Sequence, residues 1–212
     1  LLLFLLRRSC STGSRHLVAR RQRQIGIRDG YRSLSNNIMQ SVRFSRSLLM
    51  YPAVTWVDAV LARFILNTLT GLIVMICLLV GVVVVSDTRV ILDFSAMFTA
   101  VWMTCLLGLG IGVLNCVFLG MFPVWAQVWS IITRPLFILS GIFFLIDGFP
   151  KNVQKLMWLN PLAHPIAEMR SGFYPSYRAE NVDVVYVGLF GLITLFLGVV
   201  LLVRYHRDIL NN

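Results

Sequence analysis

Charged residues are scarce in this chain of 212 residues. Asp, Glu, Lys and Arg together make up 13% of it, about half of the share found in soluble domains. Apolar residues make up 58%, and the mean hydropathy is +0.79. So few charged groups cannot cover the surface of a soluble domain, so the composition excludes that class and indicates an integral membrane protein.

The residues that common catalytic and metal sites require are also few. Lysine occurs only at Lys151 and Lys155, neither of which follows a glycine, so the Gly-Lys-Ser/Thr phosphate-binding loop is absent. The histidines are isolated, which excludes the metalloprotease motif. The cysteines have no paired spacing, so neither a disulfide framework nor a zinc site is indicated. We expect no catalytic residues, metal or cofactor. The histidines are His16, His164 and His206, and the cysteines are Cys10, Cys77, Cys105 and Cys116.

Long apolar runs are what the sequence does have. A helix needs about 20 apolar residues to cross a bilayer, and residues 59–85, 94–118, 124–146 and 184–203 qualify. The runs are continuous, whereas strands of a membrane barrel alternate apolar and polar residues over about 10 positions. The predicted fold class is an all-α integral membrane protein, a helical bundle with four visible transmembrane spans.

The net charge of +10 is concentrated at one end. Residues 1–50 hold ten Arg and one Asp, whereas the rest of the chain is nearly neutral, so the charge does not indicate nucleic-acid binding. Basic residues mark the cytoplasmic side of a membrane. Residues 1–50, and Arg204 and Arg207 after the last span, therefore predict that both termini are cytoplasmic and that the loops 86–93 and 147–183 face outward.

Residues 1–30 form an irregular, Arg-rich segment that has no apolar period. We expect it to be the remnant of a truncated or frame-shifted upstream span, and a targeting peptide is the alternative. Regular patterning resumes near Tyr31, so a transmembrane domain is expected over 31–212.

An amphipathic helix is expected between Ser35, as its N-cap, and Pro52. Ile38, Met39 and Val42 share one face, and the position before a proline disfavours the helical conformation. The helix is either an interfacial helix under the lipid headgroups or a docking surface for a cytoplasmic partner.

Small residues predict where helices approach closely. Gly108 and Gly112 lie four positions apart and share a face of the second span. Gly188, Gly191 and Gly198 form a weaker stripe on the last span.

Arg134 falls near the middle of the expected third span. An arginine at the centre of a membrane helix costs roughly 2.5–3.5 kcal/mol, so it should face a partner or a wet cavity. One interpretation is a structural pairing with Asp58 or with a carbonyl at a helix end. The other is a functional contact with phosphate or carboxylate groups.

After a turn at 147–150, two short helices are expected at the outer interface. Val153, Leu156, Met157 and Leu159 recur at helical spacing. Asn160 can cap a second helix that begins at Pro161, is broken or re-capped at Pro165 and ends at Gly172. The pair is either a re-entrant gate or a loop lying on the surface, and it carries aromatic residues typical of the interfacial belt: Trp158, Phe173, Tyr174 and Tyr177.

Three motifs in this order resemble the permease subunit of ABC transporters that export capsular polysaccharide across the bacterial inner membrane. They are VRFSRSLLMYPAVTWVDAVLAR at 42–63, RPLFILSGIFFL at 134–145 and KNVQKLMWLNPLAHPIAEMRSGFY at 151–174. The resemblance extends from Tyr31 to the C-terminus. Pro52, Asp58 and Arg63 match the entry to the third span of that family, and two of the family's six spans are not readable.

The resemblance implies a permease that forms a homodimer, pairs with separate ATPase subunits and passes a lipid-linked polysaccharide. It has no catalytic residues, because the partner hydrolyses ATP. It implies an ATPase-coupling helix at about 36–49 with Asn36, Met39, Val42, Arg43 and Arg46, and an outer gate at 147–174. The candidate channel or gate residues are Arg134, Lys151, Lys155, Trp158, His164, Glu168, Arg170 and Tyr174.

Two alternatives remain open at this stage. One is an exporter of another glycan, such as O-antigen or teichoic acid, or of a drug. The other is a membrane scaffold of glycan assembly that does not transport. A neighbouring reading frame for an ATPase would favour export over the scaffold.

Overall fold

The computed structural model describes residues 29–45, 55–85, 93–141, 149–173 and 181–211, and these contain helices and no strand. The helices are residues 29–39 (helix 29–39), α3 (Ser41–Phe44), α4 (Trp56–Val85), α5 (Phe94–Met121), α6 (Trp125–Leu139), α7 (Lys151–Trp158), α8 (Ala163–Phe173) and α9 (Val184–Asn211). The predicted fold class is confirmed.

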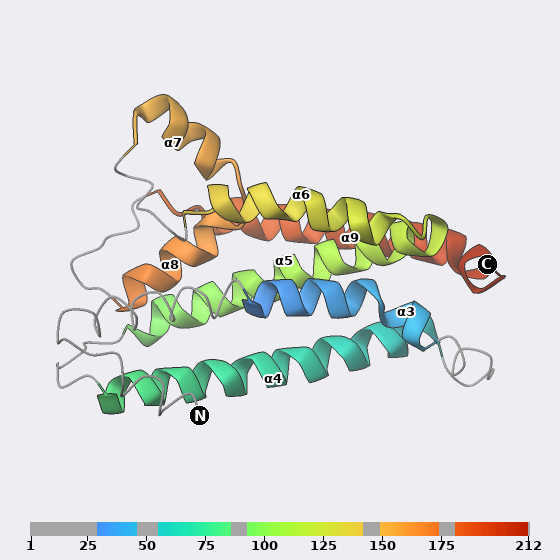
Figure 1. Cartoon of the computed structure of the whole chain (residues 1–212), viewed down its shortest axis with the longest axis horizontal. Helices are drawn as coiled ribbons and strands as arrows, with labels where there is room; N and C mark the ends of the chain where they lie inside the picture. The colour runs from blue at the N-terminus through green and yellow to red at the C-terminus, as the bar shows by residue number, and fades with distance from the viewer. Residues whose placement is uncertain (1–28, 46–54, 86–92, 142–148, 174–180, 212) are drawn as a thin grey trace.

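Among the described residues, three helices are long and apolar enough to cross a membrane. They contain Trp56–Cys77 in α4, Phe94–Met121 in α5 and Val184–His206 in α9. These helices cover the predicted first, second and fourth spans, and all three lie along the long axis of the molecule (Figure 1).

The predicted third span differs from the structure, because α6 ends at Leu139 instead of continuing to Ile146. The Ser140 N–H donates to Phe137 O at 3.3 Å, and its hydroxyl donates to the same carbonyl at 2.7 Å. Gly141 follows with φ of 75°, which leaves the right-handed helix. Residues 142–148 lie outside the described part of the chain.

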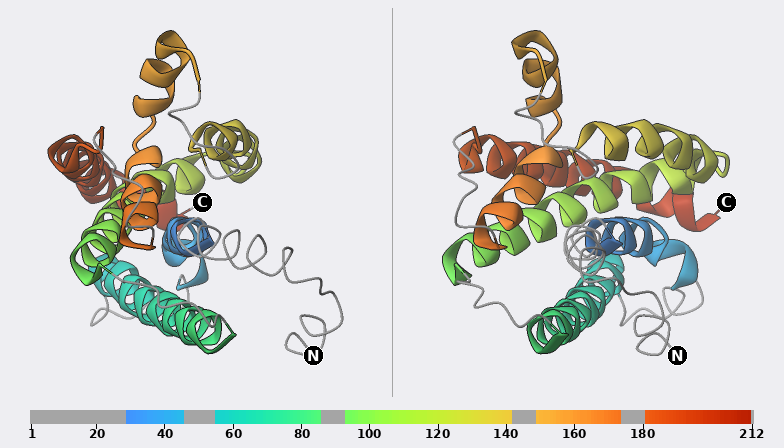
Figure 2. Two further views of the ribbon diagram at one scale, coloured as in Figure 1. Left: turned by 90° about the vertical axis from the view of Figure 1, so that its left-hand side faces the viewer. Right: turned by 60° about the vertical axis from the view of Figure 1, so that its left-hand side comes forward.

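Helix α5 occupies the centre of the bundle. In the stretch of each helix that qualifies as a span, 67% of the residues of α5 are buried, against 17% in α9 and 6% in α4. Helix 29–39, α4, α8 and α9 lie around it (Figure 2). A helix that is apolar all round suits such an enclosed position.

Glycines set the close contacts of α5. A Cβ on Gly108 would lie 2.6 Å from Leu34, and one on Gly112 would lie 2.8 Å from Ile38. The predicted small-residue face of the second span is therefore covered by helix 29–39. Leu34 and Ile38 pack there in one apolar cluster with Val113.

The opposite contact of α5 is with α9. A Cβ on Gly110 would lie 2.5 Å from Gly191 O, and one on Gly198 would lie 2.8 Å from the backbone of Leu114. Gly191 and Gly198 thus confirm the predicted stripe. Gly188 does not take part, because nothing lies within 4 Å of the position of its Cβ.

Helix α4 meets helix 29–39 through a pair of amides. Asn37 Nδ2 donates to Asn67 Oδ1 at 2.6 Å, and Asn67 Nδ2 donates to Arg63 O at 2.7 Å. At its start, Asp58 Oδ2 accepts hydrogen bonds from the backbone N–H and the hydroxyl of Thr55. Asp58 therefore satisfies groups at the beginning of its own helix.

Candidate functional site

The segment after α6 forms two short helices, as predicted, and only the second packs into the bundle. Helix α8 lies against the first turns of α5, where the Asp93 N–H donates to Gly172 O at 3.0 Å. Its apolar face joins a buried cluster with Met97 and Ala100 of α5. Helix α7 projects away from the other helices (Figures 1 and 2).

Asn160 organises the turn between the two helices. Its side-chain oxygen accepts from the Leu162 N–H at 3.1 Å, and its backbone oxygen accepts from the Ala163 N–H at 3.0 Å. Its amide also donates to Leu136 O at 2.8 Å, which ties the turn to α6. The predicted cap is confirmed, although α8 begins at Ala163 rather than Pro161.

Pro165 does not break α8, contrary to one expectation. It is the third residue of the helix, where a backbone N–H has no intrahelical partner to lose. The helix therefore continues through Pro165 to Phe173, one residue beyond the predicted end at Gly172.

His164 connects three elements. Its side chain is 3% exposed. Nδ1 accepts from the Asp183 N–H at 3.1 Å, so the ring proton is on Nε2, which donates to Trp158 O at 2.9 Å. Its ring also packs against those of Trp158 and Tyr186. Burial lowers the pKa of His164, so the structure favours the neutral ring.

This arrangement predicts a loss of stability in mild acid. The folded state disfavours a proton on His164, whereas the unfolded chain binds one below about pH 6.5. Stability is therefore fully present above that pH and falls as the pH decreases through 6 toward the lower folded pKa. Thermal unfolding from pH 8 to 5 should show this slope in the wild type and a flatter one in His164→Gln. His206→Gln, on α9, should keep the wild-type slope, and equal slopes in all three proteins would contradict the assignment.

The charged residues of α8 are held by the bundle. Arg170 is 8% exposed, and its Nη2 donates to Gly141 O at 2.8 Å. Glu168 is half-buried and accepts from the Thr99 hydroxyl at 3.3 Å, and burial raises the pKa of Glu168. Lys151 and Lys155 are exposed on α7. Tyr174 lies outside the described residues.

Arg134 lies in a polar cleft between helix 29–39 and α6. The cleft has a volume of about 150 Å³, and Arg32 and Asn36 also line it. Arg134 is five residues before the end of α6 at Leu139. It forms no hydrogen bond or ion pair with any residue that the structure describes. The expected pairing with Asp58 is absent there, because Asp58 binds Thr55.

The described part of the predicted coupling segment, residues 36–45, is mostly helical, but its helix does not start at Ser35. Helix 29–39 already includes that residue, which is 1% exposed and lies in the helix interior, so the N-cap prediction is wrong. The helix is interrupted at Gln40 before α3 begins. Met39 and Val42 are buried, whereas Arg43 is exposed. Arg46 lies outside the described residues.

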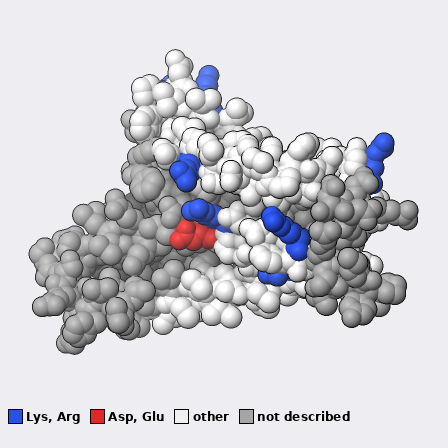
Figure 3. Space-filling model, turned by 45° about the vertical axis from the view of Figure 1, so that its right-hand side comes forward, with Lys and Arg blue, Asp and Glu red and all other residues white. Residues whose placement is uncertain are grey.

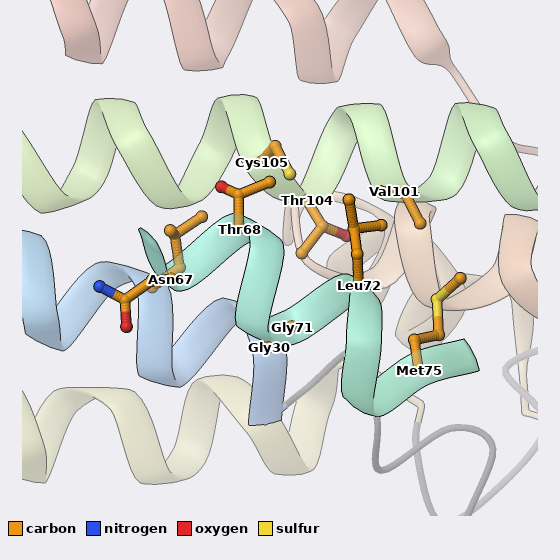
Figure 4. A pocket seen from close by; sticks show the side chains of 10 residues that line it. Gly30, Asn67, Thr68, Gly71, Leu72, Met75, Val101, Thr104 and Cys105 are labelled. Carbon is orange, nitrogen blue, oxygen red and sulfur yellow. The ribbon is translucent and has the colours of Figure 1, made fainter. Parts of the chain in front are cut away.

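A second, smaller pocket was not predicted from the sequence. It has a volume of about 60 Å³ and lies between Gly30, α4 and α5, with Thr68, Leu72 and Cys105 in its lining (Figure 4). The Thr68 hydroxyl is buried there and forms no hydrogen bond with a residue in the described part of the chain. The pocket is too small for a sugar chain, and no motif marks it.

Comparison with known proteins identifies the family. Residues 32–174 match the family described as ABC-2 type transporter, and the chain belongs to it. The match includes residues 32–39 of helix 29–39 and all three motifs that carry the resemblance found in the sequence, at 42–63, 134–145 and 151–174.

Three relatives at 22–30% identity carry the names of transport or export proteins. The chain is 30% identical over 171 residues to the polysialic acid transport protein KpsM of Escherichia coli, a match that covers 81% of this chain and 66% of that protein. It is 25% identical to the capsule polysaccharide export inner-membrane protein CtrC of Neisseria meningitidis, covering 84% and 68%. For BexB of Haemophilus influenzae, which has the same description, the identity is 22% and the coverage is again 84% and 68%. The chain thus spans about two thirds of the length of these relatives.

Proposed function

We propose that this chain is the transmembrane permease component of an ATP-driven exporter that moves capsular polysaccharide across the bacterial inner membrane. The observation that carries the proposal is the match to the ABC-2 transporter family over residues 32–174, together with relatives named for capsule polysaccharide export. The helical bundle and its α7–α8 hairpin agree with a membrane transport subunit. Both termini would be cytoplasmic.

The proposed partners are a separate ATPase subunit, a second copy of the chain and a lipid-linked polysaccharide. The sequence carries no phosphate-binding loop, so the free energy would come from ATP bound by the partner. Arg43 and the exposed Phe44 at the end of α3 would contact the ATPase, whereas Met39 and Val42 would hold this segment against the bundle. Movement of the ATPase subunits would then reach the bundle through helix 29–39, which packs on α5.

Charge reversal at Arg43 tests this coupling. Co-expression with the ABC ATPase encoded in the same locus should allow the two proteins to be purified together, and Arg43→Glu should weaken their association by about tenfold, which is roughly 1.4 kcal/mol. Surface export of polysaccharide should fall in parallel. The matched control for association is Lys155→Glu, which reverses an exposed charge on the projecting α7 and should leave co-purification with the ATPase unchanged.

The outcomes separate the alternatives. Unchanged association and export in Arg43→Glu would show that the coupling assignment is wrong. No association of the wild-type chain with any ATPase would instead favour a scaffold of glycan assembly. Export of O-antigen, teichoic acid or a drug in place of capsule would correct the cargo and leave the transport class intact.

A further inference from the structure

We propose that the cleft between helix 29–39 and α6 binds the phosphate group of an anionic membrane lipid. The two helices that form the cleft run antiparallel. Tyr31 of helix 29–39 therefore packs against Phe137 near the end of α6, with ring centroids 6.0 Å apart. Polar side chains line both walls beyond this aromatic contact. They are Arg32, Ser35 and Asn36 on one wall and Ser130, Thr133 and Arg134 on the other.

The cleft carries positive charge that its own lining does not neutralise. Arg32 and Arg134 both line it, and none of its lining residues is acidic. Neither guanidinium forms a hydrogen bond or ion pair within the described part of the chain. Asp29 precedes Arg32 by three positions and already has an interaction of its own. On the face shown in Figure 3, basic groups outnumber acidic ones on a mostly uncharged surface.

A buried hydroxyl in the wall also needs a partner. Ser35 is 1% exposed and lines the cleft, and its Oγ has no hydrogen-bond partner among the described residues. Leaving such a group unpaired in an apolar environment is unfavourable. A phosphate would accept from this hydroxyl and from the two guanidinium groups, whose planar arrangement of donors matches phosphate oxygens.

The position of the cleft points to a lipid as the source of the phosphate. Ile131 and Ile138 flank Arg134 on α6 and are 66% and 55% exposed, so the rim suits acyl chains. Arg134 lies five residues before the end of α6, which corresponds to about 8 Å along a helix. Ile131 and Ile138 lie about one helical turn before and after Arg134, so a headgroup bound at the guanidinium would have its acyl chains beside them.

The test measures lipids retained by the purified full chain. The protein is reconstituted in nanodiscs that contain equal amounts of phosphatidylglycerol and phosphatidylcholine, released into detergent and examined by native mass spectrometry. Wild-type protein should keep phosphatidylglycerol preferentially, and the double variant Arg32→Gln/Arg134→Gln should lose about tenfold or more of it. Arg134→Lys should fall between them, because one ammonium cannot replace a two-pronged guanidinium. Lys155→Gln should behave as the wild type.

Two further experiments distinguish a lipid phosphate from free phosphate, and they do not depend on the folding of the double variant. A photo-crosslinking residue at position 130 should label phosphatidylglycerol in otherwise wild-type protein, and excess inorganic phosphate should not prevent this labelling. Equal retention of both lipids, or unchanged retention in a folded double variant, would overturn the proposal. It would also fail if inorganic phosphate alone prevented labelling, or if the crosslinker labelled a soluble glycan or the protein's own chain instead of lipid.

Discussion

Replacement of Gly198 by leucine is expected to separate α9 from α5 and to lower the free energy of unfolding more than the same replacement at Gly188. Any Cβ at position 198 would lie 2.8 Å from the Leu114 nitrogen and 3.1 Å from the Val113 carbonyl carbon. These are backbone atoms of the central helix, so no side-chain rotation can relieve the clash. Overpacking typically costs about 1–3 kcal/mol, and an upper value near 3 kcal/mol corresponds to a melting temperature lower by about 6–12 °C.

Gly188→Leu is the matched control, because it makes the same substitution in the same helix. Nothing lies within 4 Å of a Cβ at position 188, so this variant should melt within about 2 °C of the wild type. Size-exclusion chromatography of detergent-solubilised protein after heating measures both variants. Equal melting temperatures for Gly198→Leu and Gly188→Leu would show that α5 and α9 do not pack as described.

Removal of the Arg170 side chain is the second large effect expected. Arg170 is 8% exposed, and its guanidinium donates to Gly141 O, which joins α8 to the turn that ends α6. Arg170→Ala removes a charge-assisted hydrogen bond, worth about 1.5–3 kcal/mol, and leaves the carbonyl without this donor. The variant should melt at a clearly lower temperature and lose export, because α8 is no longer fixed to α6.

Two comparisons separate this contact from the loss of a positive charge. Arg170→Lys keeps the charge but not the guanidinium geometry, so it should recover only part of the stability. Lys155→Ala, which also removes a positive charge from the hairpin but at an exposed position, should change the stability by less than about 0.5 kcal/mol. Similar losses in Arg170→Ala and Lys155→Ala would contradict a specific role for the Gly141 contact.

The sequence predicted those features that arise from local patterns. Continuous apolar runs were sufficient to locate α4, α5 and α9, because a membrane requires length and hydrophobicity and little else. Asn160 was recognised as a cap since its side chain needs only the two following residues to act. The glycine faces of α5 and α9 followed from helical spacing alone.

Other features depend on contacts that spacing does not reveal. The end of α6 at Leu139 lies within an unbroken apolar run, so hydropathy could not locate it. His164 and Arg170 were channel or gate candidates by family resemblance, and the sequence did not reveal that both bind backbone groups from other segments. The cleft around Arg134 forms only because helix 29–39 lies antiparallel to α6. The first residues of helix 29–39 adjoin a stretch without apolar periodicity, so the sequence did not reveal this contact. Whether any of the candidate gate residues contacts a substrate stays a prediction.

The amide pair between Asn37 and Asn67 has a consequence for how deeply α4 can sit. Both side chains are part-buried where the two helices meet, so a displaced amide loses a partner that its surroundings replace only in part. A shift of α4 by one residue along helix 29–39, about 1.5 Å, would break the 2.6 Å contact between Nδ2 and Oδ1. The two asparagines therefore fix the position of α4 along helix 29–39, which apolar contacts alone would not fix.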